Sequence, residues 1–190
     1  PQMTLSCSLD QTVLSGMDAL TQLVESYLST NASVFTDSLA LGAIELFVQS
    51  FENVLNNPND LKHRSNVAYA AYISGITLAN AGLGTIHGFA SGIGGIIPVP
   101  HGLVCATMMP VINEITLKKT VENSDIQTIN KYINLGKIVS KYRPVSVNKQ
   151  IKSEKDLPFL FIDYITQLKN KYIHRGLSYY GLIKTQFDHI

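Results

Sequence analysis

The chain has 190 residues, of which 45% are hydrophobic and 15% charged, which is typical of a folded domain and excludes a disordered segment. Its formal net charge of +1 provides no basic surface for nucleic acid. The charge is unevenly distributed, because residues 1–110 carry seven acids and two bases whereas residues 111–190 carry seven acids and thirteen bases. We therefore look for metal-binding or catalytic residues in the acidic first part.

Cysteine usage and hydropathy indicate the compartment. Cys7 and Cys105 allow at most one disulfide and lack the spacing of a zinc knuckle, which favours a reducing cytoplasm. The most apolar run, residues 93–112, contains three prolines and a histidine, so the sequence predicts neither a signal peptide nor a membrane span. Residues 2–13 show little periodicity and are interpreted as a linker, which allows for a preceding domain.

Helical periodicity dominates the first half of the chain. Ser15 and Asp18 match a capping box that would begin a first helix ending near residue 28. Thr36 is the expected cap of a second helix, which ends before Pro58. A third helix is expected over residues 61–81, and its stripe of small side chains predicts that it is the buried central helix. The stripe consists of Ala68, Ala71, Gly75, Ala79 and Gly82.

The middle of the chain is rich in glycine and proline. Six glycines between residues 82 and 95, followed by two prolines, predict an irregular segment in place of a regular helix. A further helix should begin at Gly102 with a kink at Pro110, and residues 125–142 and 155–172 have the periodicity of two more. No segment has a strand pattern. The expected fold class is therefore all-α, with one domain over residues 1–190.

A group of polar residues around this segment could bind a metal. His87 and His101 are each followed by glycine, and the loop between them could bring both rings to one point. Asp18 and Gln22 are four residues apart on a helix, so both oxygens could reach the same ion. The structural alternatives are packing histidines, a capping role for Asp18 and a solvated Gln22. Cys105 is interpreted as a small core residue, with metal ligation as the less favoured alternative.

Several segments resemble ordered motifs of the iron-containing (group III) alcohol dehydrogenases. They are Gly-Met-Asp-Ala-Leu-Thr at 16–21, Asn-Ala-Gly-Leu-Gly-Thr-Ile-His-Gly at 80–88 and Pro-Val-Pro-His-Gly at 98–102. The stretch at 175–182 also resembles a segment near the C-terminus of that family. The resemblance covers nearly the whole chain. It implies the all-helical, metal-binding C-terminal half of such an enzyme, with a dehydroquinate synthase-like fold, and the family's nucleotide-binding domain is absent from this chain.

The resemblance also implies a metal site and a reaction. A divalent metal, iron(II) or zinc, would be held by Asp18, Gln22, His87 and His101. The position of Gln22 is commonly histidine in the family, and an amide is the weaker donor. Ser91 occupies a position that is often a catalytic histidine. The implied reaction is hydride transfer between NAD(P), held mainly by the absent domain, and a small alcohol or aldehyde, in a cytoplasmic homo-oligomer. The isolated domain should be inactive and should expose an apolar docking face.

Two other functions stay open. The chain could be a degenerate helical scaffold or interaction module that has lost metal catalysis through Gln22 and Ser91. It could also belong to a metal-dependent lyase or synthase of the dehydroquinate synthase-like group, although the Asn-Ala-Gly-Leu-Gly motif at 80–84 argues against this. The basic stretch over residues 118–184 is interpreted as solvated outer helices.

Overall fold

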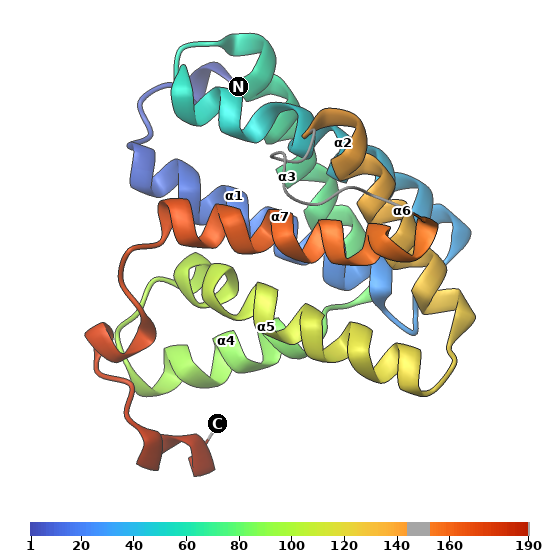
Figure 1. Ribbon diagram of the computed structural model, residues 1–190. Helices are drawn as coiled ribbons and strands as arrows, with labels where there is room; N and C mark the ends of the chain where they lie inside the picture. Colours follow the sequence, from blue (N-terminus) through green and yellow to red (C-terminus); the bar gives the residue numbers. More distant parts are fainter. Residues whose placement is uncertain (144–152, 190) are drawn as a thin grey trace.

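The computed structural model describes residues 1–143 and 153–189, in which seven α-helices and four short 3₁₀ helices form without any β-strand (Figure 1). The predicted all-α fold class is confirmed. The α-helices are α1 (Leu9–Leu28), α2 (Val34–Asn56), α3 (Leu61–Ala81), α4 (Thr85–Ile96), α5 (His101–Glu122), α6 (Ile126–Tyr142) and α7 (Leu157–Tyr172).

The central helix of the bundle is α1. It contacts α2, α3, α4, α5 and α6, and twelve of its 20 residues are buried. In Figure 1, α2 and α3 lie above α1, and α4 and α5 lie below it. The prediction that the helix over 61–81 is central is therefore wrong, although its bounds are correct. Only six of its 21 residues are buried, and small residues such as Ala71, Gly75 and Ala79 face solvent.

The start of α1 differs from the prediction. Ser8 caps the helix by accepting a hydrogen bond from the Gln11 amide at 3.2 Å, so the last five residues of the expected linker, 9–13, belong to α1. Ser15 lies inside the helix and its hydroxyl donates to the Gln11 carbonyl at 2.7 Å. The Ser15–Asp18 capping box is therefore wrong, and Asp18 has no capping role to explain its position.

The start of α2 is also displaced. Ser33, and not Thr36, is the N-cap: the Thr36 amide donates to the Ser33 hydroxyl at 3.3 Å, and the Ser33 amide donates to the Thr36 hydroxyl at 2.8 Å. By length and composition alone α2 could cross a membrane. However, Phe47 and Phe51 stack with ring centroids 4.4 Å apart and are fully buried, as expected of a core helix in a folded bundle.

The glycine-rich segment forms a helix, which corrects the sequence prediction. Four of the six glycines lie within α4, and only residues 82–84 form a turn, where Gly82 has a φ of +77°. Glycine costs about 1 kcal/mol relative to alanine in a helix interior. Burial of Ile86, Ala90 and Ile93 on one face of α4 offsets that cost, because α4 packs on α5.

The remaining helices agree closely with their predicted ranges. α5 begins at His101, one residue earlier than expected, and continues through Pro110 to Glu122. α6 and α7 occupy residues 126–142 and 157–172. Asp125 caps α6 by accepting the Thr128 amide at 3.1 Å.

Candidate metal centre

Three helices bring four potential metal ligands together. Asp18 comes from α1, His87 from the first turn of α4, and His101 and Cys105 from the first turns of α5. One ligand atom from each lies within 4.8 Å of the other three. His87 Nε2 is 3.3 Å from Asp18 Oδ1, His101 Nε2 is 3.5 Å from the same oxygen, and Cys105 Sγ is 3.8 Å from His87 Nε2. Residues 83 positions apart in the sequence thus share one site.

Gln22 lies beside this cluster but points its amide nitrogen at it. Gln22 Nε2 donates to Asp18 Oδ2 at 3.0 Å, while Gln22 Oε1 accepts from the Ser74 hydroxyl at 2.7 Å. The amide therefore links α1 to α3 and orients the Asp18 carboxylate. In this arrangement Gln22 is a partner of a potential ligand, and its oxygen faces away.

Glu25 completes the site and was missed in the sequence analysis. Its carboxylate is buried; Oε1 accepts the Ile86 amide at 2.6 Å, and Oε2 accepts the His87 amide at 3.3 Å. Oε2 also lies 2.6 Å from His87 Nδ1. Gly84, the N-cap of α4, has no side chain to cap the helix, and a Cβ there would lie 2.8 Å from Glu25 Oε1. Glu25 thus replaces the missing cap and fixes the His87 ring.

The signal for Glu25 was present in the sequence. Asp18, Gln22 and Glu25 have the spacing i, i+4, i+7, which places all three on one face of α1. A partly buried face that carries two carboxylates and an amide requires polar partners. Those partners are His87 and Ser74.

The start of α5 presents His101 through a close helix contact. A Cβ on Gly102 would collide with the Leu14 carbonyl oxygen of α1, so glycine is required where the two backbones meet. Close packing thus explains the glycine after His101 but not the one after His87, because a Cβ on Gly88 would meet no atom within 4 Å. The side chain of His101 is 48% exposed and that of His87 8%, so one side of the site is open.

Ser91 lies one turn after His87 on α4 and is exposed. A hydroxyl there has little basicity compared with an imidazole. Among the residues that the structure describes, no hydrogen bond joins Ser91 to the cluster. Ser91 is therefore not one of the four potential ligands.

The cluster strongly shifts the pKa values of its members. Burial by itself lowers the pKa of His87, but hydrogen bonds to Asp18, Cys105 and Glu25 raise it to about 11. Burial by itself raises the pKa of Asp18, but hydrogen bonds with His87 and Cys105 and the charge of His101 hold it below its usual range. Burial raises the pKa of the Cys105 thiol. Without a cation, His87 is therefore an imidazolium between two carboxylates.

These groups suit a divalent cation. The Nε2 proton of a protonated His87 lies where Asp18, His101 and Cys105 converge, so a cation there would replace a positive charge that the site already stabilises. The remaining Nδ1 proton would be held by Glu25, as is usual for histidines that bind metals. Carboxylate, imidazole and thiolate donors are those that bind zinc and iron(II).

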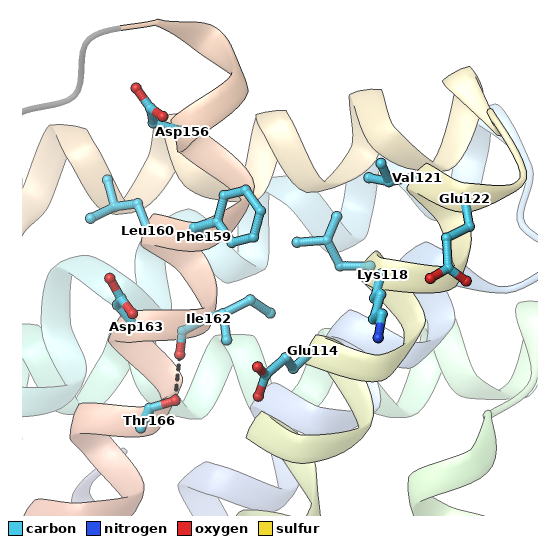
Figure 2. Close-up of a pocket in the computed structure, with 11 residues that line it drawn as sticks. Glu114, Lys118, Val121, Glu122, Asp156, Phe159, Leu160, Ile162, Asp163 and Thr166 are labelled. Atoms are coloured by element: carbon cyan, nitrogen blue, oxygen red, sulfur yellow. Dashed lines mark hydrogen bonds between the residues drawn. The ribbon is translucent and has the colours of Figure 1, made fainter.

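A separate cavity of about 810 Å³ lies between α5 and α7 (Figure 2). The side chains of Phe159 and Leu160 from α7 and of Val121 from α5 line it together with acidic residues and Lys118. It shares no lining residue with the metal cluster and contains neither histidine nor cysteine. This cavity between α5 and α7 is therefore distinct from the candidate metal centre.

Comparison with known proteins gives a consistent set of relatives. Residues 12–187 match the family described as "Fe-containing alcohol dehydrogenase family, C-terminal". The 1,3-propanediol dehydrogenase of Citrobacter freundii is 37% identical over 110 residues, which are 58% of this chain and 28% of that protein. Alcohol dehydrogenase 4 of Saccharomyces cerevisiae is 36% identical over 107 residues, 56% of this chain and 28% of that protein.

Solved structures share the fold over nearly all of this chain. A 1,3-propanediol oxidoreductase structure superimposes with a TM-score of 0.83 and 28% identity, covering 98% of this chain and 46% of that one. An alcohol dehydrogenase from Oenococcus oeni gives a TM-score of 0.82 and 28% identity, covering 99% and 46%. The chain thus spans less than half the length of the relatives it matches.

Proposed function

We propose, because this chain belongs to the iron-containing alcohol dehydrogenase family and matches the C-terminal domain of that family, that the protein transfers a hydride between NAD(P) and a small alcohol or aldehyde. The domain over residues 1–190 would bind the metal, and a nucleotide-binding domain of the same family type would bind NAD(P). The exposed side chain of His101 supports this division, since a second domain could cover the site there.

Asp18, His87 and His101 would hold the divalent metal, iron(II) or zinc, with Gln22 beside them. Such a metal acts as a Lewis acid that polarises the oxygen of an alcohol or aldehyde. The chain's own residues would do the positioning: Glu25 keeps the Nδ1 proton of His87, and Gln22 orients the Asp18 carboxylate. Ser91 would contribute a hydroxyl near the substrate side in place of a histidine.

Three further properties belong to the same proposal. The domain alone would be catalytically inactive, because in this scheme the hydride donor lies chiefly on the nucleotide-binding domain. A cytoplasmic location suits Cys105, which is a free thiol. A homo-oligomer is supported by the exposed apolar side chains that line the cavity between α5 and α7, such as Val121 and Phe159.

The convergence of Asp18, His87 and His101 is the single observation that carries the proposal. The test is calorimetric titration of the full chain with zinc and, without oxygen, with iron(II). We expect stoichiometric binding that His87→Ala abolishes. The matched control is His174→Ala, since His174 is exposed and far from the cluster in sequence. Equal binding by both variants would contradict the metal site, and the absence of binding by the unmodified protein would favour the scaffold alternative.

A further inference from the structure

We propose that Cys105 Sγ, and not the Gln22 amide, is the fourth protein donor of this site, which makes it an Asp-His-His-Cys centre that prefers zinc to iron(II). This inference rests on the proposed metal-binding function. It assigns a metal-ligand role to a side chain that composition alone would place in the core.

The positions of the four ligand atoms support a tetrahedral set. With metal–nitrogen and metal–oxygen bonds of about 2.0–2.2 Å and a metal–sulfur bond of about 2.3 Å, neighbouring donors in a tetrahedron are about 3.3–3.6 Å apart. The observed separations are 3.3 Å for His87 Nε2 to Asp18 Oδ1, 3.5 Å for His101 Nε2 to Asp18 Oδ1 and 3.8 Å for Cys105 Sγ to His87 Nε2. For these three pairs, shifts of a few tenths of an ångström would suffice, and all four ligand atoms lie within 4.8 Å of one another.

Cys105 is held in place by the fold. Its side chain is fully buried, and its position one turn after His101 puts both residues on the same face of α5. The close contact of Gly102 with Leu14 fixes this end of α5 against α1. Cys105 Sγ also lies 3.8 Å from His87 Nε2, so the thiol already faces the cluster.

Gln22 is arranged for a different task. Its oxygen accepts the Ser74 hydroxyl and its nitrogen, which has no lone pair for a metal, faces Asp18. Coordination through Gln22 Oε1 would require the amide to turn over and Asp18 Oδ2 to lose its donor. Cys105 requires no such change.

A thiolate changes which metal the site favours. Sulfur is a soft donor that selects zinc over iron(II) relative to an all-oxygen and nitrogen set. Burial does not prevent this, because a coordinating thiol is deprotonated by the metal and its proton is released to solvent. Cys105 on α5 would thus provide the fourth donor in place of the side chain at position 22 on α1, where the amide of Gln22 is a weak donor.

The test uses cobalt(II) as a spectroscopic substitute for zinc in the full chain. We expect the unmodified protein to bind cobalt with intense tetrahedral visible bands and a near-ultraviolet sulfur-to-cobalt charge-transfer band. Cys105→Ser should lose the charge-transfer band, whereas Cys7→Ser should keep it because Cys7 is exposed in the turn before α1. Gln22→Ala should also keep it.

Each other outcome has a distinct meaning. Cobalt binding without a charge-transfer band in the unmodified protein would overturn the assignment of Cys105 while the metal site itself stands. No cobalt binding at all would overturn both this inference and the proposed function. If Cys105→Ser proves unfolded by circular dichroism, X-ray absorption of the unmodified zinc protein decides: one sulfur neighbour at about 2.3 Å supports the inference, and its absence refutes it.

Discussion

Removing the Glu25 carboxylate should destabilise the protein more than any surface substitution. Glu25 is 7% exposed, and its two oxygens accept the Ile86 and His87 amides and contact His87 Nδ1. In Glu25→Ala these three groups lose their acceptor in a buried place. The α4 N-terminus also loses its cap, because Gly84 cannot provide one.

The magnitude follows from these contacts. Breaking a buried ion pair by deleting one partner costs about 3–5 kcal/mol, and we expect Glu25→Ala to lower the free energy of unfolding by this amount. Glu25→Gln keeps the volume and one acceptor oxygen, so it should cost about 1–3 kcal/mol. The surface control is Glu154→Ala, whose side chain is 70% exposed and pairs with Lys137, and it should change stability by less than about 1 kcal/mol.

The assay is urea unfolding of the three variants by circular dichroism at pH 7, together with amide hydrogen exchange. In Glu25→Ala the Ile86 and His87 amides should exchange faster than in the unmodified protein. If Glu25→Ala costs no more than Glu154→Ala, or if these two amides keep their protection, the capping role assigned to Glu25 is wrong.

Three further predictions, made with four substitutions, test the helix contacts, the metal ligands and the surface charges. Gly102→Ala should cost about 1–3 kcal/mol in urea unfolding because its Cβ meets the Leu14 carbonyl, whereas Gly75→Ala, in open space on α3, should stabilise by about 0.5–1 kcal/mol; the opposite order would contradict the packing. Gln22→His should not raise the affinity for zinc in calorimetry, because Cys105 already completes the four-ligand set and Asp18 loses the hydrogen bond from the Gln22 amide; a clear gain in affinity would return position 22 to the ligand set. Hydrogen bonds from Lys141 and, to a smaller extent, Tyr142 lower the pKa of the Glu45 carboxyl. The stabilising contribution of Glu45 is therefore present at pH 7 and is lost as the pH falls below about 4. Glu45→Gln should therefore lower the melting temperature more at pH 7 than at pH 3; an equal loss at both would refute this.

Much of the helical pattern could be predicted, because apolar periodicity reports which face is buried. It succeeded for α3, α6 and α7, whose predicted ranges differ from the structure by at most two residues. It failed for α4, because local propensity cannot include the packing of Ile86 and Ile93 against other helices. It also misplaced the start of α1, since Ser8 and Ser15 offer equivalent capping chemistry and tertiary burial decides between them.

The candidate site was predictable in its residue types and less so in their roles. His87 and His101 stood out beside glycines, and the structure brings them to 5.4 Å between ring centroids. Glu25 continues the helix face of Asp18 and Gln22, but that spacing does not show that its carboxylate is buried, because a solvated glutamate would fit the same pattern. The orientation of Gln22 depends on Ser74, which lies 52 positions away, and no local pattern contains that contact.

The most direct test of the metal centre is anomalous diffraction from crystals of the full chain grown with zinc. The account predicts one peak at the zinc absorption edge, about 2.0–2.3 Å from Asp18 Oδ1, His87 Nε2, His101 Nε2 and Cys105 Sγ. A peak that contacts only the first three would retain the metal centre and remove Cys105 from it. An ordered cluster without a peak, or a peak elsewhere on the protein, would contradict the metal-dependent function itself.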